Sequence, residues 1–358
     1  MDKGPARLAV GGLLLLAAAC VGARQGEAAG ITFPGTTWTQ VDPVSVNVDP
    51  ATLNQAIALG KSRHGQGMIT RWGNLVGSWG NIYTQYRLSS ATKAWSSLIT
   101  GLAIDDGLLA QTDRAQAVYP GFVPLPKVTP TTTKWASQIT IHQLLTMTAG
   151  FGSNTDGFAP LKFAPGTTWF YSNSAVDALG DVVTYAFDRD LLDVFRERIL
   201  RPIGVADSEV RWQVNPKRDT RVSSNPNREF AGSLFTDPNA MARVGLLLMS
   251  HGSWNGKQLI SADYVDRATH PQADLQGVQL ADDCVGQNKR YGLLWFTNAD
   301  GKMANVPRDA FFQWGSNDVF TLVVPSLGLV ASRQGYAFGD GCYEVIEPLM
   351  TLMAQAMR

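Results

Sequence analysis

Length, composition and charge narrow the classes of protein that this chain of 358 residues can represent. Hydrophobic residues make up 45% and charged residues 17%, which suits a compact globular protein and argues against long disordered tails. The 30 Lys and Arg residues balance 30 Asp and Glu residues, so no global field attracts nucleic acid or an anionic membrane surface. We therefore expect no nucleic-acid partner.

The first 29 residues have the pattern of an export signal. Lys3 and Arg7 precede an apolar run over residues 8–19, which is too short to span a bilayer comfortably. We expect an exported protein that is periplasmic, extracellular or attached to the outer envelope. Cys20 follows the run, as in bacterial lipoprotein signals. Lipid on Cys20, the only membrane attachment that we expect, is one interpretation, and ordinary cleavage before Gly30 is the other.

Two further cysteines, Cys284 and Cys342, would remain in the exported chain. An oxidising compartment lets such a pair form a bridge. We expect a disulfide between them. Two unpaired buried thiols are the alternative, because a bridge requires Cα atoms within about 7 Å of each other.

The segment after the signal predicts a hairpin followed by a long helix. β-rich residues at 68–72 and 75–79 flank Gly73-Asn74, which is typical of a two-residue turn. From Ser90 onward the apolar residues follow helical spacing as far as Gly107, a residue type that commonly ends helices. The apolar stripe consists of Trp95, Leu98, Ile99, Leu102 and Ala103.

The middle of the chain predicts irregular and helical segments. Residues 111–135 are rich in Pro and Thr without a sustained period, which indicates an irregular crossing into a lobe. Thr140 and Gln143 have the spacing of a capping box before a short helix, and another helix is expected near Asn173. Residues 240–249 are again helical in pattern, and residues 254–257 predict a tight turn.

Strand patterns return near the C-terminus. Short β-rich runs occupy residues 291–296, 311–314, 319–324 and 329–333, and a final helix is expected to bury Ile346, Leu349, Met350 and Met353. Strands from both chain ends predict an α/β chain of the α+β type: an antiparallel sheet flanked by helices, with a mostly helical lobe inserted at about residues 108–240. We expect one catalytic domain over residues 30–358, with its site at the seam between sheet and lobe.

The start of the predicted long helix carries a pattern suited to nucleophilic catalysis. A serine hydroxyl needs a neighbouring base, and on a helix the amine of Lys93 is within reach of the Ser90 hydroxyl three residues earlier. The helix N-terminus also favours developing negative charge. To act as a base, Lys93 must be neutral. Taken alone, Ser-x-x-Lys also occurs by chance, and a solvated helix start is the alternative.

Two later segments complete a candidate site. Tyr171-Ser172-Asn173 precedes a predicted helix, and a phenol there can relay protons; a half-buried aromatic with Asn173 as an N-cap is the alternative. Gln313-Trp314-Gly315-Ser316 is a β-run interrupted by glycine, where a backbone can approach a ligand closely. The amides of Ser90 and Ser316 would then form an oxyanion hole, unless Gly315 only makes a turn.

These elements together resemble the serine β-lactamase and penicillin-binding protein superfamily. Ser-x-x-Lys is followed 81 residues later by Tyr-x-Asn and then by a glycine-containing strand, and residues 139–150, 165–174 and 242–248 look familial as well. The resemblance is closest to the class C-like branch, particularly its carboxylesterases and 6-aminohexanoate-dimer hydrolases. It implies a β-lactamase/transpeptidase-like fold over roughly residues 50–355. It also implies that Lys93 and Tyr171 work with Ser90 through an acyl-enzyme, without a cofactor.

The chain departs from the family at the third motif. Antibiotic-handling members usually place Lys or His before the glycine-containing pair, whereas this chain has Gln313 and Trp314. Because a cation for a substrate carboxylate is missing, and because Trp314 would narrow the substrate cleft, we expect a small neutral ester or amide as the substrate. A β-lactamase or D-alanyl-D-alanine carboxypeptidase is the alternative.

Other functions are less consistent with the sequence. The four histidines, His64, His142, His251 and His270, lack His-Glu-x-x-His spacing, so we expect no catalytic metal. No Gly-x-Ser-x-Gly sequence occurs, which disfavours a Ser-His-Asp hydrolase. An inactive envelope binding protein on the same fold is a further alternative. The sequence does not indicate an oligomeric state.

Overall fold

A six-stranded antiparallel sheet organises this computed structural model, which describes residues 30–122, 129–152, 157–281, 290–338 and 343–357. The predictions of an export signal and of lipid on Cys20 lie outside the described residues, as does the predicted Cys284–Cys342 disulfide. No helix in the described part of the chain is long and apolar enough to cross a membrane.

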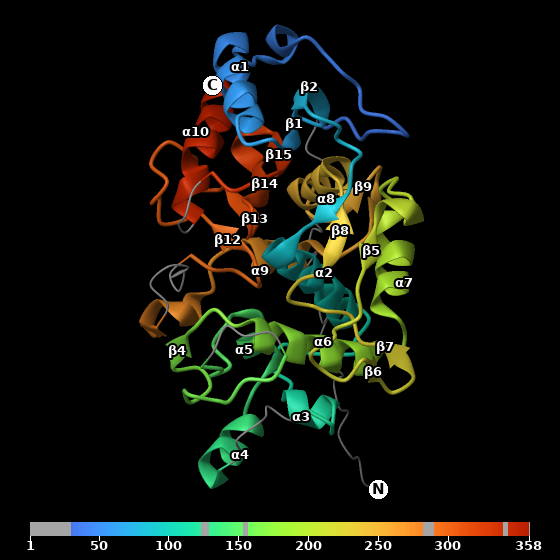
Figure 1. Ribbon diagram of the computed structural model, residues 1–358, viewed down its shortest axis with the longest axis vertical. Coiled ribbons are helices and arrows are strands. Elements are labelled where there is room, and N and C mark those ends of the chain that lie inside the picture. Colours follow the sequence, from blue (N-terminus) through green and yellow to red (C-terminus); the bar gives the residue numbers. More distant parts are fainter. Residues whose placement is uncertain (1–29, 123–128, 153–156, 282–289, 339–342, 358) are drawn as a thin grey trace, which may run out of the picture.

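Strands from the two ends of the chain join in one continuous sheet, with the two N-terminal strands beside the four C-terminal strands (Figure 1). Pairing between β1 and β15 joins the N-terminal hairpin to the C-terminal strands, with Met68 opposite Ser332. The strand order is β12 (Phe296–Thr297), β13 (Phe311–Gly315), β14 (Val319–Val324), β15 (Leu329–Gln334), β1 (Gln66–Arg71) and β2 (Asn74–Trp79).

Helices cover both faces of this sheet. On one face, α1 (Pro50–Lys61) packs on β2 and against α10 (Glu347–Ala356). On the other face, α8 (Pro238–Met249) packs on β14 and β15, and Gly245 lets its backbone come close to Val330 and Thr321. Side chains alternate between the faces along each strand, so register decides which residues face α8.

A mostly helical region lies between the strands of the sheet in sequence and beside the sheet in space. In Figure 1, α2 lies between the sheet and the rest of this region, and α3 and α4 lie at the end farthest from α1 and α10. Its helices are α2 (Thr92–Asp105), α3 (Ala115–Val118), α4 (Pro130–Ala136), α5 (Ile141–Leu145), α6 (Asn173–Phe187) and α7 (Leu191–Phe195). The 310-helical turn η2 (Ser89–Ala91) leads into α2.

Short strands and one further helix connect these parts. One small sheet has the order β3 (Tyr86–Arg87), β8 (Leu234–Thr236) and β5 (Arg211–Trp212). The two-stranded pairs are β4 (Thr168–Trp169) with β11 (Gln279–Leu280), β6 (Arg221–Val222) with β7 (Asn225–Pro226), and β9 (Ser253–Trp254) with β10 (Lys257–Gln258). Helix α9 (Ala262–Thr269) packs against α2.

Several local predictions are confirmed. The Thr140 side chain accepts a hydrogen bond from Gln143 N at 3.2 Å, and the Gln143 side chain accepts one from Thr140 N at 2.9 Å, which is a complete capping box. Asn255 and Gly256 form the expected turn with positive φ angles. The first hairpin also forms, but its positive-φ turn residues are Trp72 and Gly73, one position earlier than predicted.

Two predictions are wrong. Residues 291–296 do not form a strand, because Gly292 N donates to Trp295 O at 2.9 Å and closes a turn, and only Phe296–Thr297 pairs in the sheet. The segment 111–135 is not irregular throughout, since it includes α3 and most of α4. The Pro and Thr residues at 129–132 form an N-cap and a first helical turn there, which are positions that suit both residue types.

Asp237 caps the N-terminus of α8 from inside the protein. Its Oδ1 accepts a hydrogen bond from Ala240 N at 2.9 Å, and its side chain is fully buried. Burial raises the pKa of Asp237 from 3.8 to about 7, because the charged form loses its hydration. Ionisation of Asp237 as the pH rises through neutral therefore lowers the stability of the folded state.

We predict that Asp237→Asn raises the free energy of unfolding at pH 8 by about 1–3 kcal/mol, because Asn is an equally good N-cap without a charge to bury. The folded protein holds the Asp237 proton up to about pH 7, whereas the unfolded chain releases it near 3.8, so the wild type loses stability as the pH rises between these values. Denaturant unfolding at pH 5 and pH 8 checks this, with the smaller gain expected at pH 5. A variant no more stable than wild type at pH 8 would contradict it.

Candidate active site

Ser90 and Lys93 meet at the start of α2. Ser90 is the middle residue of η2 and Lys93 lies in the first turn of α2, and 3.0 Å separates Ser90 Oγ from Lys93 Nζ. The preceding residue, Ser89, has a positive φ of 50°. This backbone geometry is uncommon for serine and is typical of strained positions beside functional groups.

The Lys93 amine has a second oxygen partner. Lys93 Nζ donates a hydrogen bond to Ala231 O at 2.8 Å, and only 2% of the lysine is exposed. Ala231 belongs to the loop of residues 229–233, which leads into β8. The amine is therefore held between Ser90 Oγ and a backbone carbonyl, away from bulk water.

The 229–233 loop is itself fixed by several contacts. Ser96, one helical turn after Lys93 on α2, donates to Phe230 O at 2.8 Å, so two α2 side chains bind consecutive carbonyls of the loop. Trp212 Nε1 donates to Glu229 O at 2.8 Å, and the Trp212 ring stacks on Phe230 with 5.5 Å between centroids. The loop is a rigid support for Lys93.

Tyr171 contacts the same amine through its ring. It lies between β4 and α6, is 6% exposed, and its ring centroid is 4.9 Å from Lys93 Nζ. Among the described residues no hydrogen bond joins Lys93 Nζ to the Tyr171 hydroxyl, so the contact is with the face of the ring. The N-cap of α6 is Ser172, which accepts from Ala175 N at 3.3 Å, and the partly buried Asn173 is the first helical residue.

Asp177 is a buried carboxyl that the sequence analysis missed. It lies on α6, is 1% exposed, and its Oδ1 accepts a hydrogen bond from Ala231 N at 3.0 Å. Burial raises the pKa of Asp177 from 3.8 to about 6. The only sequence signal for it is an acidic residue within the apolar stripe of α6, beside Val176 and Leu179.

The last residue of β13 packs directly against the serine turn. A Cβ atom added to Gly315 would lie 2.3 Å from Leu88 O and 3.1 Å from Ser90 N. Only glycine permits this approach, and it brings the start of the exposed residue Ser316 to the edge of the same turn.

The other two residues of this motif point away from each other. Gln313 is 1% exposed and donates from Nε2 to Thr321 Oγ1 at 2.8 Å, on the face of the sheet that carries α8. Trp314 lies on the opposite face, where Nε1 donates to Asp318 Oδ1 at 3.3 Å and the ring contacts Phe296. That Trp314 narrows a substrate cleft remains a prediction.

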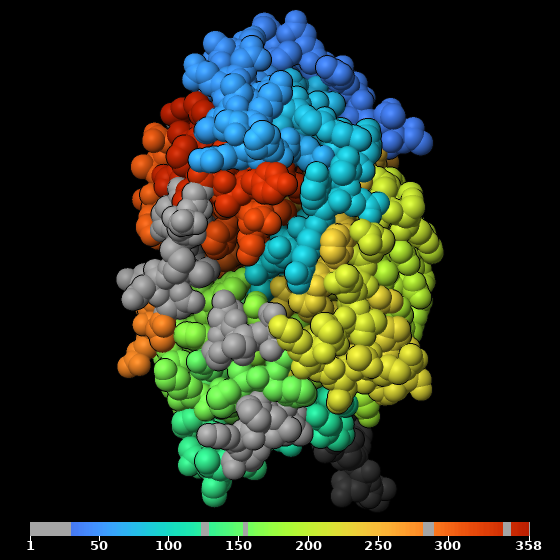
Figure 2. Space-filling view, in the orientation of Figure 1, coloured from blue at the N-terminus to red at the C-terminus, as the bar shows by residue number. Residues whose placement is uncertain are grey.

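The segment that precedes α2 lies at the molecular surface. Figure 2 shows the cyan segment that precedes α2 along the boundary between the red C-terminal part and the yellow middle of the chain. Ser90, Lys93, Tyr171 and Gly315 come from η2, α2, the approach to α6 and β13, so the site residues derive from both the sheet and the helical region.

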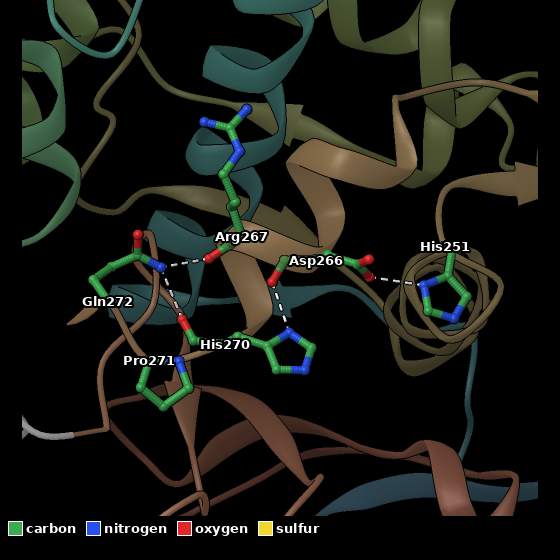
Figure 3. A pocket seen from close by; sticks show the side chains of 6 residues that line it. All are labelled: His251, Asp266, Arg267, His270, Pro271 and Gln272. Carbon is green, nitrogen blue, oxygen red and sulfur yellow. Dashed lines mark hydrogen bonds and ion pairs between the residues drawn. The ribbon is translucent and has the colours of Figure 1, made fainter. Parts of the chain in front are cut away.

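A separate surface hollow beside α9 contains none of these residues. Figure 3 shows its lining side chains, with His251 Nδ1 2.8 Å from Asp266 Oδ1 and His270 Nδ1 2.7 Å from Asp266 O. In the described ranges, no group of three or more His, Cys, Asp or Glu residues is placed to hold a metal ion.

Solved structures with the same architecture include proteins of different activities. A beta-lactamase from Mycobacterium bovis superposes with a TM-score of 0.62 at 16% identity, covering 86% of this chain and 100% of that chain. A protein from Bacillus anthracis assigned as a 6-aminohexanoate-dimer hydrolase gives 0.62 at 15% identity, covering 90% and 86%. A hydrolase with promiscuous acyltransferase activity gives 0.60 at 17% identity, covering 86% and 96%. At these identities the similarities establish the fold.

The sequence itself carries the family assignment. No functionally curated protein matches the chain. A family model described as Beta-lactamase matches residues 57–331, which confirms the resemblance and the predicted β-lactamase/transpeptidase-like fold. Because this match spans most of the sequence, the chain belongs to the beta-lactamase family.

Proposed function

We propose that this protein is a serine hydrolase that cleaves a small neutral ester or amide through an acyl-enzyme on Ser90. The observation that carries the proposal is the 3.0 Å approach of Lys93 Nζ to Ser90 Oγ, inside a buried site where Ala231 O holds the amine in place. A hydroxyl with an adjacent, oriented base is the arrangement that nucleophilic catalysis requires.

In the proposed acylation step, Lys93 accepts the Ser90 proton while Ser90 Oγ bonds to the substrate carbonyl carbon. Tyr171, whose ring centroid lies 4.9 Å from Nζ, relays a proton to the departing alcohol or amine. Breaking the ester or amide bond leaves the acyl group on Ser90. Water then attacks the carbonyl carbon of this acyl-enzyme and gives a proton to the same base and relay groups. Ser90 Oγ regains a proton as its bond to the acyl group breaks, and the acid is released.

Two backbone amides are proposed to stabilise the oxyanion. Ser90 N lies 3.1 Å from the position that a Cβ on Gly315 would occupy, so the end of β13 lies beside the nucleophile. Ser316 N, the next amide along the strand, is the second donor. Fixed amides lower the free energy of the charged intermediate without reorganising when it forms.

A neutral substrate fits the third motif. The position where antibiotic-handling relatives place a cation holds Gln313, which is uncharged and already bonded to Thr321 inside the sheet. A carboxylate on the substrate would lack that charge-assisted partner. The structural neighbours described as a 6-aminohexanoate-dimer hydrolase and as a hydrolase with acyltransferase activity suit amide and ester chemistry, and the beta-lactamase neighbour keeps antibiotic hydrolysis as the second candidate.

We predict that wild type reacts covalently with a fluorophosphonate probe and hydrolyses a short-chain nitrophenyl ester, and that Ser90→Ala does neither, because no other group supplies the attacking oxygen. Intact-mass measurement and ester turnover check both results. Turnover of a chromogenic cephalosporin should be far slower than that of the ester.

The two candidates separate on this panel. Faster cephalosporin than ester turnover in wild type would favour the β-lactamase. If folded wild type neither reacts with the probe nor turns over any ester, amide or cephalosporin, the enzymatic function is refuted. The inactive envelope binding protein is then the alternative that remains.

We predict that Lys93→Ala lowers the probe labelling rate and kcat/KM by about 10³–10⁴-fold, because the serine loses its base. The circular dichroism spectrum should stay that of wild type, since Nζ makes only two hydrogen bonds within the described part of the chain. Labelling at near-normal rate in Lys93→Ala would remove the lysine from the mechanism.

We predict that Gly315→Ala lowers kcat by about 10²-fold, because the added Cβ would clash with Leu88 O and push β13 away from the serine turn, separating the two amides. Gly277→Ala is a matched control, since no atom of the described residues lies within 4 Å of its added Cβ. Equal kcat values in the two variants would argue against an oxyanion hole at this strand end.

A further inference from the structure

Asp177 and Lys93 bind opposite sides of the same residue. Ala231 donates its N–H to Asp177 Oδ1 at 3.0 Å and accepts at its carbonyl oxygen from Lys93 Nζ at 2.8 Å. Lys93, the proposed base, lies on α2, and Asp177 lies on α6, the helix that follows the proposed proton relay Tyr171 in the sequence. Ala231 therefore bridges these two helices.

We propose that Asp177 is a positioning residue: by holding Ala231 in place, its carboxylate aims Lys93 Nζ at Ser90 Oγ. This inference rests on the hydrolase function proposed above and assigns it a residue outside the Ser90, Lys93 and Tyr171 group. A carboxylate that accepts from a backbone N–H forms a stronger bond than a neutral acceptor does, so ionised Asp177 fixes Ala231 most firmly.

The surroundings of Asp177 give this bond a pH dependence. Loss of hydration is the main cause that raises its pKa, the bond to Ala231 N and the charge of Arg218 lower it, and the nearby Glu229 raises it, so the net pKa is about 6. Gly157 N also faces the carboxylate, 3.4 Å from Oδ2. Above pH 6 Asp177 is ionised and holds Ala231; below pH 6 it gains a proton and the bond weakens. We therefore expect kcat/KM to fall as the pH drops through about 6.

The same burial makes Asp177 costly to the fold. Its pKa is higher in the folded protein than the 3.8 of an exposed carboxyl, so the folded state binds the proton more tightly and stability falls as the pH rises from about 4 to 6. An uncharged residue of the same shape should therefore stabilise the protein at pH 8 while weakening the support of Lys93. A residue with a purely structural role would lower both properties together.

We predict that Asp177→Asn lowers kcat/KM at pH 8 by about tenfold, removes the acid limb near pH 6 and raises Tm at pH 8, because an amide oxygen accepts from Ala231 N without titrating. Asp177→Ala, which leaves Ala231 N without this acceptor, should lower kcat/KM by about 100-fold and also lower Tm. Ester turnover and probe labelling from pH 4.5 to pH 9, with Tm at each pH, check these values.

Asp237→Asn is the matched control, because Asp237 is also a buried carboxyl with a raised pKa but makes no bond to Ala231. It should raise Tm and leave the acid limb of kcat/KM in place. Loss of the limb in Asp237→Asn, or its persistence in Asp177→Asn, would overturn the inference.

Crystal structures of the two Asp177 variants at pH 8 provide a readout independent of turnover. Lys93 Nζ should stay near Ser90 Oγ in Asp177→Asn and move away in Asp177→Ala. If wild type shows no hydrolysis or labelling, the proposed function fails while these structures still decide the positioning role. An unmoved Lys93 in Asp177→Ala would refute that role even in an active enzyme.

Discussion

A buried amine between two oxygen atoms is the constraint on which the site depends. Lys93 Nζ contacts Ser90 Oγ on one side and Ala231 O on the other, with the face of Tyr171 closing a third side. A lysine side chain has four rotatable bonds, and fixing it costs about 2 kcal/mol of rotamer entropy. Two hydrogen bonds in a dry site make one orientation dominant, and that orientation faces the serine.

The fold supplies these partners from segments that are distant in the sequence. The α2 helix carries Lys93 and Ser96, and both side chains bind the loop that holds Phe230 and Ala231. Strand β13 reaches the serine turn only because Gly315 has no side chain. Strand β13 and the hydrogen-bonded 229–233 loop thus meet at the start of α2. Small displacements there would separate the atoms proposed to react.

Local chemistry explains which parts of this arrangement were predictable from the sequence. The Thr140 capping box and the Asn255-Gly256 turn depend on residues close in sequence, and the Ser90–Lys93 approach depends on one helical turn. The support of Lys93 depends on a backbone carbonyl, and every residue has one, so no residue type marks Ala231. The prediction of a strand at residues 291–296 is wrong because a run of aromatic and leucine residues does not distinguish a strand from a turn that buries the same side chains.

Buried carboxyls and strained backbone lie close to the groups proposed to react. Asp177 supports Ala231, Ser89 precedes the nucleophile with φ 50°, and Asn317 and Asp318 follow Ser316 with φ 66° and 53°. Each such feature costs the fold stability, and each also limits the conformations open to a neighbouring reactive atom. Because hydrophobic packing alone would favour a neutral residue at Asp177 and a relaxed turn before Ser90, these two features fit the catalytic role proposed for Ser90 better than a purely structural one.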